Sequence, residues 1–270
     1  PIVKGIIRKK VLTGLGLADA RIAGSGSAPI PADILKWYDT LGLPVVEGYG
    51  MSEDFAYSHM STADRRKAGF VGFPSTGVET RISDDGEIQI KSPGDMMGYY
   101  KEPEMTAECY TEDGFFKTGD RGTYNEQGLL KITGRVKELF KTSKGKYVAP
   151  VPIENLLGAE GVIEQACVSG SGRPACYACL QLAEDLRPKF DDPAFREEVT
   201  AKLEALLKSV NSQIEGYEAL QFLIVLRDEW TTANNFLTPT LKIKRNIIEE
   251  TYEPSLDGWY DSRQKVIWQD

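Results

Sequence analysis

The chain of 270 residues lacks the features that would place it in several large classes of protein. It has no apolar run close to the roughly 20 residues that span a bilayer. It has 32 basic against 40 acidic side chains and a formal net charge of -8, which argues against a generic nucleic-acid binder. It has no GxxxxGK(S/T) motif, which excludes a Walker-type phosphate loop.

Cysteine and histidine are scarce, and neither is arranged for metal chemistry. Cys176 and Cys179 form a CxxC, but no second pair or nearby histidine completes a zinc set. The stretch ACYACLQL is typical of a strand, in which residues three apart lie on opposite faces, so we predict core packing and the reduced thiols of a cytoplasmic protein. His59 is the only histidine. We predict a surface or satisfied side chain; the alternative is a neighbour of the acyl end, because His59 comes just after GYGMSE. No Ser-centred nucleophile elbow accompanies it, which argues against a nucleophilic triad.

The first half of the chain changes texture at about residue 70. Before it, a strand and loop (20–31), a helix (32–42) and a second strand and loop (44–53) follow one another, as in an α/β sheet. After it, alternating runs flank turns at Asp85-Gly86 and at 125–128, which predicts a small β subdomain over about 70–134. We therefore expect residues 1–134 to form one domain.

The second half predicts a separate α+β domain over 135–270. Two candidate strands precede the clearest helix, DDPAFREEVTAKLEALLKSVNSQI, which Asp191 or Asp192 can cap and Pro193 can start. Its predicted apolar stripe consists of Phe195, Val199, Leu203, Leu206 and Val210. A buried strand, LQFLIVL, and a helix beginning NIIEETYEP follow. No low-complexity linker precedes this domain, so we expect a hinge at about 135–138.

Three loops in the first half are placed where ligands gather. GSGSAP (24–29) and GYGMSE (48–53) each follow an apolar strand, and FKTGD (116–120) lies among the hairpins. In open α/β sheets, ligands bind at the carboxyl ends of strands, and small residues there allow close approach of the backbone.

These loops carry side chains suited to a nucleotide. Tyr49 could stack on a base, and Ser52 offers a hydroxyl. Glu53 offers a carboxylate for a hard cation such as Mg²⁺, and Asp120 could accept hydrogen bonds from ribose hydroxyls. Each loop alone is a weak signal, because glycine-rich turns are common.

Two basic segments stand out in this acidic chain. Residues 134–146, GRVKELFKTSKGK, place five basic side chains among thirteen residues. They could meet nucleic acid, a membrane surface or the phosphates of a small ligand, or they could form a solvated loop. LTPTLKIKRN (237–246) presents Lys242, Lys244 and Arg245 directly after a segment that cannot continue a helix. On composition alone it is another solvated loop.

Taken together and in this order, the segments resemble the adenylate-forming superfamily, which includes acyl-CoA synthetases, luciferases and peptide-synthetase adenylation domains. The matching segments are GYGMSE (family YGxTE), GEIQIKSPGDMMGYY (GEIxxxGxxxxxGY), GFFKTGDRG (GWxxTGD), GRVKELFKTSKGKYVAP (the hinge motif) and TPTLKIKR (the closing lysine motif). The resemblance implies the later part of a large α/β adenylation domain with its β subdomain, followed by a mobile α+β domain.

The resemblance also implies a reaction. Family members activate a carboxylate with ATP as an acyl-adenylate, release pyrophosphate and pass the acyl group to a thiol, often that of coenzyme A. By resemblance, Ser52 contacts phosphate and Glu53 coordinates Mg²⁺. The loop 24–29 and Tyr49 are expected to hold adenine. The residues expected to bind ATP or AMP include Gly26, Ser27, Ala28, Pro29, Gly48, Gly50 and Met51.

Further roles follow from the same motifs. Asp120 and Arg135 are expected to hold ribose. Lys242 is expected to reach the α-phosphate and carboxylate oxygens, where its charge would offset charge that develops during the reaction. Lys137 occupies the hinge position. Lys144, Gly145 and Lys146 would face coenzyme A.

The chain departs from the family pattern in two places. The Ser/Thr/Gly-rich phosphate loop that precedes these motifs in the family is absent, so we expect a piece of a longer enzyme that is inactive alone. Thr240-Leu241 replaces the usual Ser-Gly before Lys242, a variant that looks most like long-chain fatty acyl-CoA synthetases.

We therefore predict part of an AMP-forming fatty acyl-CoA ligase. The alternatives are a relative that activates an aryl acid or loads a carrier protein, and a non-catalytic module that binds nucleotide or coenzyme A. The expected partners are fatty acid, ATP, coenzyme A, Mg²⁺ and the missing N-terminal part of the enzyme, and nucleic acid is not among them. We expect a cytoplasmic location, and peripheral contact with a membrane stays open.

Overall fold

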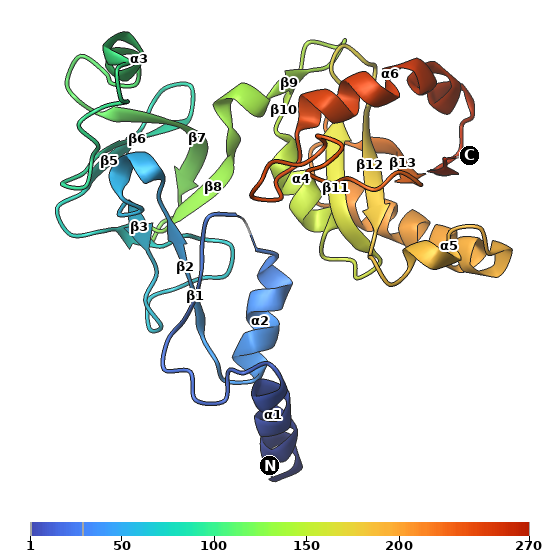
Figure 1. Ribbon diagram of the computed structural model, residues 1–270, viewed down its shortest axis with the longest axis horizontal. Coiled ribbons are helices and arrows are strands. Elements are labelled where there is room, and N and C mark those ends of the chain that lie inside the picture. The colour runs from blue at the N-terminus through green and yellow to red at the C-terminus, as the bar shows by residue number, and fades with distance from the viewer. Residues whose placement is uncertain (1, 29, 270) are drawn as a thin grey trace. The chain divides into compact units, whose positions relative to one another are not determined.

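A computed structural model describes residues 2–28 and 30–269 and divides the chain into two compact units (Figure 1). The first unit comprises Pro1–Lys137 and the second Glu138–Asp270. No helix in the described part of the chain is long and apolar enough to cross a membrane.

The first unit begins with helices and a mixed sheet. Helix α1 (Ile2–Gly14) was not expected, whereas β1 (Ala23–Ser25), α2 (Ala32–Thr40) and β2 (Val45–Tyr49) follow the predicted order. β1 and β2 run parallel, and β3 (His59–Met60) and β4 (Phe73–Pro74) extend the sheet antiparallel. The predicted helix ends where Gly42 adopts φ 68°. Leu12, Leu41 and Leu43 form the small core under α1 and α2.

The β subdomain of the first unit is an antiparallel sheet. Its strands are β5 (Glu79–Ile82), β6 (Glu87–Lys91), β7 (Phe116–Tyr124) and β8 (Leu130–Arg135), in that spatial order, with α3 (Pro103–Glu108) between β6 and β7 along the chain. The predicted Asp85-Gly86 turn is present, with φ 85° at Gly86. Fully or nearly fully buried Ile88, Ile90, Phe116 and Leu130 form its core.

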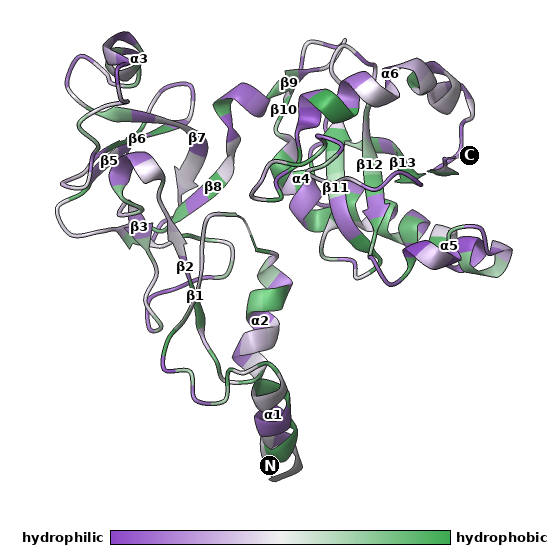
Figure 2. Ribbon diagram, in the orientation of Figure 1, coloured by the Kyte–Doolittle hydropathy of each residue, from purple (hydrophilic) through white to green (hydrophobic). Residues whose placement is uncertain are grey.

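The second unit is a four-stranded sheet with helices on both faces. The strands lie in the order β11 (Ile163–Ser169), β12 (Cys176–Leu182), β13 (Leu220–Leu226) and β14 (Val266–Trp268). The β11–β12 pair is antiparallel and the next two pairs are parallel. Helices α4 (Pro150–Leu157) and α5 (Pro193–Asn211) pack on one face, and α6 (Arg245–Asp261) packs on the other. Figure 2 shows how strongly apolar residues concentrate in the central strands.

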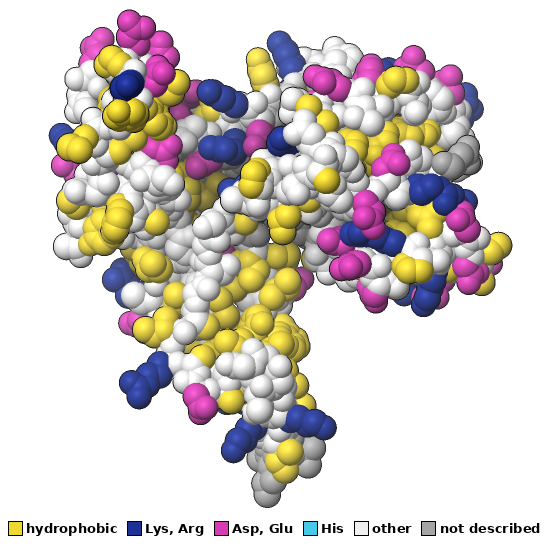
Figure 3. Space-filling view, in the orientation of Figure 1, with side chains coloured by type: hydrophobic (Ala, Val, Ile, Leu, Met, Phe, Trp, Pro, Cys, Tyr) yellow, Lys and Arg dark blue, Asp and Glu magenta, His cyan; other side chains and the backbone are white. Residues whose placement is uncertain are grey.

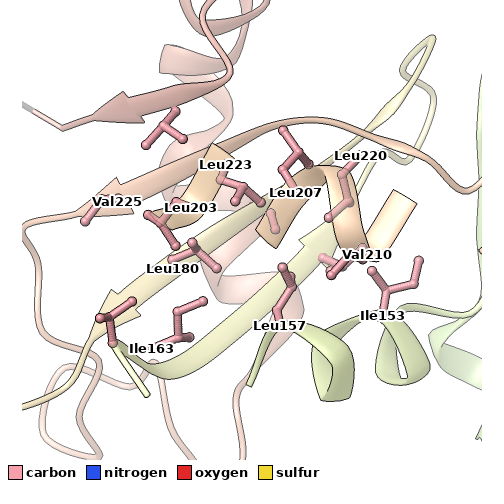
Figure 4. Close-up of a cluster of buried hydrophobic side chains, with 14 of the residues drawn as sticks. Ile153, Leu157, Ile163, Leu180, Leu203, Leu207, Val210, Leu220, Leu223 and Val225 are labelled. Atoms are coloured by element: carbon pink, nitrogen blue, oxygen red, sulfur yellow. The ribbon is translucent and has the colours of Figure 1, made fainter. Parts of the chain in front are cut away.

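The burial of individual side chains tests the predicted patterns. Cys176 lies in the core below α4 and α5 and Cys179 in the core below α6, so the CxxC points to opposite faces as predicted. On α5, however, Leu207 is buried and Leu206 only partly so, which corrects the predicted stripe. Figure 4 shows Leu207 beside Leu203 and Val210 against the sheet. Asp192 caps the helix, because its side chain accepts hydrogen bonds from the backbone N–H groups of Ala194 and Phe195.

Candidate nucleotide-binding site

The ends of β1 and β2 bring the first two glycine-rich loops together. Ser25 is the register partner of Glu47, so the loop after β1 begins beside the end of β2. A Cβ on Gly26 would lie 3.2 Å from the carbonyl oxygen of Gly48, which shows how closely the two backbones approach. Ser27 adopts φ 67°, and residues 26–28 are exposed. Pro29, predicted to contact adenine, lies outside the described residues.

The Thr-Gly-Asp segment forms an irregularity in β7. Gly119 adopts φ 71° and donates its N–H to Glu87 Oε1 at 2.8 Å. The Thr118 hydroxyl donates to the Ile88 carbonyl oxygen at 2.7 Å and accepts from the Asp120 N–H at 3.1 Å. A Cβ on Gly119 would meet no atom beyond its chain neighbours within 4 Å, so the glycine is needed for its conformation and not for space. The irregularity sets the direction of Asp120.

Three predicted nucleotide-binding residues meet at Asp120. The Tyr49 hydroxyl donates to Asp120 Oδ2 at 2.8 Å, and Arg135 Nε donates to Asp120 Oδ1 at 2.9 Å. Asp120 and Arg135 are register partners of β7 and β8. The Asp120 side chain is 17% exposed and that of Arg135 is 56% exposed. Burial, and then the Asp120 charge, raise the pKa of Tyr49, so the hydroxyl stays a neutral donor.

This arrangement leaves hydrogen-bonding capacity for a ligand. Each carboxylate oxygen has about two lone-pair sites, and one site on each oxygen of Asp120 is used. Within the described residues, the two Nη groups of Arg135 make no hydrogen bond. A diol could therefore donate to Asp120 while an anion contacts Arg135.

The GYGMSE loop closes tightly on itself. A Cβ on Gly50 would lie 2.6 Å from the Cα and carbonyl carbon of Ala56, so only glycine allows this approach. The Met51 carbonyl oxygen accepts from the N–H of Ala56 at 2.8 Å, and Asp54 Oδ1 accepts from the Met51 N–H at 2.8 Å. Asp54 is fully buried, and this burial raises its pKa. The loop leaves the Ser52 side chain exposed and without a hydrogen bond to the described residues.

Glu53, the predicted metal ligand, is held at both ends. The Tyr99 hydroxyl donates to Glu53 Oε1 at 2.8 Å, and the Met96 N–H donates to the Glu53 carbonyl oxygen at 2.7 Å. The hydrogen bond to Glu53 raises the pKa of Tyr99 to about 12. Sequence reasoning missed Tyr99, although it ends the matched GEIxxxGxxxxxGY segment. Among the described residues no set of three His, Cys, Asp or Glu side chains could hold a metal.

A single carboxylate nevertheless suits Mg²⁺ at a nucleotide. Mg²⁺ keeps several waters and usually takes one or two carboxylates together with substrate phosphates. Glu53 Oε2 makes no hydrogen bond to the described residues, so one oxygen remains for such a cation.

His59 is a satisfied, buried side chain, as predicted. It is 1% exposed, with Nδ1 2.8 Å from Ser58 Oγ and Nε2 3.0 Å from the Tyr124 hydroxyl. The Tyr124 hydroxyl in turn lies 2.8 Å from Thr80 Oγ1. Burial lowers the pKa of His59 to about 4, so the ring is neutral at pH 7.

The basic residues of TPTLKIKR differ in exposure and in bonding partners within the second unit. Lys242 is exposed and has no hydrogen bond or ion pair from its ammonium to the described residues. Lys244 bonds Asn235. Arg245 is nearly buried and donates to Glu154 Oε1 at 2.5 Å and to the carbonyl oxygen of Val168 at 2.7 Å. Arg245 therefore ties α6 to α4 and β11, a structural role that the sequence did not reveal.

The predicted coenzyme A residues lie at the tip of a hairpin. Strands β9 (Phe140–Lys141) and β10 (Tyr147–Val148) flank Lys144, Gly145 and Lys146. Gly145 adopts φ 77° and donates to the Thr142 carbonyl oxygen at 2.9 Å. Lys144 is exposed, and the Lys146 ammonium lies 5.7 Å from the Tyr217 ring centroid. Lys137 ends the first unit and is exposed.

Comparison with known proteins identifies the family. The model of the AMP-binding enzyme family matches residues 7–100, and that of the AMP-binding enzyme C-terminal domain matches residues 138–264. The long-chain-fatty-acid–CoA ligase FadD15 of Mycobacterium bovis is 33% identical over 268 residues, which cover 95% of this chain and 44% of that protein.

Solved structures agree with this match. The adenylation domain of a carboxylate reductase from Mycobacterium chelonae is 26% identical, with a TM-score of 0.73 over 95% of this chain and 41% of that one. ATP-bound MatB from Rhodopseudomonas palustris is 28% identical, with a TM-score of 0.66 over 86% of this chain and 45% of that one. The chain belongs to the AMP-binding, adenylate-forming enzyme family, and its predicted fold class is confirmed.

Proposed function

We propose that this chain forms part of an AMP-forming fatty acyl-CoA ligase and supplies its ribose site, its metal carboxylate and its adenylation lysine. The observation that carries the proposal is the hydrogen-bonded set of Tyr49, Asp120 and Arg135. Residues from three separate motifs converge there on one carboxylate that still has capacity for a diol, and Tyr49 lies 71 positions from Asp120 in the sequence. This convergence favours a working nucleotide site over a purely structural sheet edge.

The geometry of the first unit supports the following proposed roles. Asp120 accepts from the ribose hydroxyls, and Arg135 contributes a cation beside it. The adenine lies along the exposed backbone of Gly26, Ser27 and Ala28, beside the GYGMSE loop. Tyr49 orients Asp120, because its hydroxyl is committed to that carboxylate. Ser52, whose exposed side chain makes no hydrogen bond to the described residues, contacts phosphate. Glu53 would hold Mg²⁺, whose charge would offset that of the nucleotide phosphates.

The second unit supplies the charges for the reaction. Lys242 is the one basic side chain of TPTLKIKR left free among the described residues, so its ammonium can approach the α-phosphate and the carboxylate oxygens. There it would stabilise the charge that develops as the acyl-adenylate forms. Lys144, Gly145 and Lys146, at an exposed hairpin tip, contact the coenzyme A side. Lys137 is the point at which the chain bends between the two half-reactions.

The acid and the cellular setting are part of the proposal. The relative with 33% identity is a long-chain-fatty-acid–CoA ligase, and Thr240-Leu241 before Lys242 also favours a fatty acid. The adenylation domain of a carboxylate reductase is a structural neighbour, so a different acyl acceptor is the second candidate. We place the enzyme in the cytoplasm, and the acyl substrate can bring it to a membrane surface.

The complete enzyme is proposed to need further protein beside the first unit. The chain spans 44% of the length of its long-chain-fatty-acid–CoA ligase relative. The first unit also exposes apolar side chains over α1 and α2, where yellow side chains gather in Figure 3. These are Ile6, Ile7, Leu15, Ile22, Ile34 and Trp37. We propose that the rest of the large domain covers them.

The first test measures nucleotide binding by the chain itself. AMP is titrated into the wild type, Asp120→Ala and Asp113→Ala by calorimetry at millimolar ligand. Asp113 is a matched control, because it too is bound to an arginine of the same sheet, Arg81, but takes no part in the proposed site. We expect Asp120→Ala to weaken AMP binding about tenfold or more, as the loss of a hydrogen bond to a charged group predicts, and Asp113→Ala to leave it unchanged.

A ribose site makes a further demand on the ligand. Replacing AMP with 2′,3′-dideoxy-AMP should weaken binding to the wild type about as much as Asp120→Ala weakens AMP binding, and should add little in the variant. Equal binding of AMP by the wild type and Asp120→Ala would show that Asp120 holds no ribose. No binding of AMP to the folded wild type would remove the basis of the nucleotide site.

A second test addresses Lys242 in a ligase that contains this chain together with the rest of the large domain. Lys242→Ala should abolish fatty acid-dependent ATP–pyrophosphate exchange and leave thioester formation from preformed acyl-adenylate intact. Lys244→Ala, which alters a neighbouring ammonium bound to Asn235, should retain exchange. Normal exchange in Lys242→Ala would disprove its role. The purified chain alone should show no exchange.

A further inference from the structure

The carboxylate of Glu53 is fixed by a segment that none of the assigned roles includes. Residues 92–100 follow β6 and cross the GYGMSE loop. The Met96 N–H donates to the Glu53 carbonyl oxygen at 2.7 Å, and the Tyr99 hydroxyl donates to Glu53 Oε1 at 2.8 Å. Two contacts from one segment, one to the main chain and one to the side chain, hold a glutamate in a single direction.

Tyr99 is itself held in place from two sides. Its N–H donates to Thr106 Oγ1 at 2.9 Å, and that hydroxyl donates at 2.7 Å to the carbonyl oxygen of Glu102, the N-cap residue of α3. Gly98 adopts φ 144°, and a Cβ there would lie 3.0 Å from the Thr106 side chain. Tyr110 adds a hydrogen bond from its hydroxyl to the Met96 carbonyl oxygen at 3.2 Å. The tyrosine therefore has a fixed backbone from which to hold Glu53.

We propose that Tyr99 is a positioning residue for the metal carboxylate. This inference rests on the proposed function, in which Glu53 meets Mg²⁺ with the nucleotide. By donating to Oε1, Tyr99 fixes the plane of the carboxylate and leaves Oε2, which has no partner among the described residues, to face the cation. A carboxylate fixed in advance loses less side-chain entropy when the cation binds. Tyr99 acts through Glu53 and touches neither nucleotide nor cation.

The neighbouring tyrosine provides a matched control. Tyr100 is 86% exposed, and among the described residues its ring contacts the ammonium of Lys101, which lies 5.3 Å from the ring centroid. Tyr99→Phe removes one hydroxyl that binds Glu53, and Tyr100→Phe removes one that binds no described residue. Both variants keep an aromatic ring in the same segment, so they differ mainly in the hydrogen bond to Glu53.

The test separates binding of the nucleotide from binding of the metal. The affinity of the chain for ATP is measured by calorimetry with EDTA and again with excess Mg²⁺, for the wild type and both tyrosine variants. The ratio of the two affinities is the Mg²⁺-dependent gain. We expect Tyr99→Phe to reduce this gain about tenfold, the low end of what outer partners of metal ligands contribute, and to leave the affinity in EDTA unchanged. Tyr100→Phe should match the wild type.

A double-variant cycle decides whether Tyr99 acts through Glu53. Glu53→Gln should lose most of the gain, and adding Tyr99→Phe to Glu53→Gln should then change it little further. A gain in Tyr99→Phe equal to that of the wild type would overturn the proposal, as would a loss that is just as large in the Glu53→Gln background.

The same affinities test the nucleotide site separately from the metal role of Glu53 and Tyr99. Failure of the folded wild type to bind ATP in EDTA and in Mg²⁺ would overturn the proposed function and this inference with it. Binding of ATP with no Mg²⁺-dependent gain in the wild type would leave the nucleotide site standing and overturn only the metal role of Glu53 and Tyr99. Circular dichroism melting of each variant shows that any loss is not caused by unfolding.

Discussion

The stability of the first unit is expected to depend on pH through its single histidine. His59 is 1% exposed, and burial lowers its pKa from 6.5 to about 4. Both ring nitrogens face hydroxyl groups, those of Ser58 and Tyr124. A neutral imidazole can donate from one nitrogen and accept at the other, and a hydroxyl can match either need. The site therefore suits the neutral ring, and among the described residues no anionic side chain bonds the ring nitrogens.

The direction of the pH dependence of stability is set by the number of protons that each state binds. Between pH 6.5 and about 4 the unfolded chain binds a proton at His59 that the folded chain does not, so stability falls as pH decreases through this window. The full shift of about 2.5 pKa units corresponds to about 3 kcal/mol, of which about 2 kcal/mol is already lost at pH 5. Above pH 7 the contribution of this histidine no longer changes.

Other buried groups titrate in the opposite direction and require a matched variant. Burial raises the pKa of Glu47, Asp54 and Asp95, so these carboxyls favour the folded state as pH falls. His59→Gln keeps all three and provides a side chain that can still donate and accept but does not titrate. The difference in unfolding free energy between wild type and variant therefore isolates the histidine.

Two measurements check the prediction. Because the chain has one histidine, the imidazole signals in a ¹⁵N–¹H spectrum belong to His59 and should titrate near pH 4. Amide hydrogen exchange of β2 and β7 at pH 7 and pH 5 should show the wild type losing about 2 kcal/mol relative to His59→Gln, while the second unit serves as an internal reference. A midpoint near 6.5, or a free-energy difference that does not change with pH, would refute the assignment of burial as the dominant cause.

Three further predictions concern local structure. Gly50→Ala should destabilise the first unit by about 1–3 kcal/mol in urea unfolding, because its Cβ would lie 2.6 Å from the backbone of Ala56; an unchanged midpoint would contradict this. Asp192→Ala should cost the second unit about 1 kcal/mol through loss of the α5 cap, and Asp191→Ala should cost less in the same thermal scan. Leu241→Gly should leave stability unchanged or raise it by up to about 1 kcal/mol, because Leu241 is exposed and adopts φ 61°; a clear loss would show that the leucine packs.

Repetitive patterns made much of the fold predictable. The Asp85-Gly86 hairpin, the cap and start of α5 and the opposite directions of Cys176 and Cys179 all follow from short-range rules of spacing. The exchange of Leu206 for Leu207 has the same origin: at 3.6 residues per turn, both lie at the edge of the stripe, and the sheet beneath decides between them. Helices α1 and α4 and the short strand β14 lacked such clear signals.

The candidate site was predictable only in its ligand-facing residues. Loop chemistry pointed to Tyr49 and Asp120, but the hydrogen bond between them joins residues 71 positions apart and depends on how two sheets pack. The same is true of Tyr99 and Glu53, 46 positions apart. Composition could not rank the basic residues of TPTLKIKR either, because only packing shows that Arg245 is nearly buried beside Glu154 while Lys242 is exposed.

The backbone conformation at Leu241 helps to explain why Lys242 is exposed while Arg245 is nearly buried. Residues 238–242 form a turn closed by two backbone hydrogen bonds. The Thr238 N–H donates to the Lys242 carbonyl oxygen at 2.8 Å, and the Leu241 N–H donates to the Thr238 carbonyl oxygen at 2.8 Å. A turn of this shape forces the residue before the lysine into the left-handed region, which explains physically why glycine suits that position. The turn also keeps Lys242 out of the helix that begins at Arg245, so its ammonium is not drawn into the ion pairs that hold α6. Leu241 thus has a strained backbone conformation, and the ammonium of Lys242 has no partner among the described residues. Strained backbone is typical of functional sites, so this combination supports the proposed contact of Lys242 with substrate.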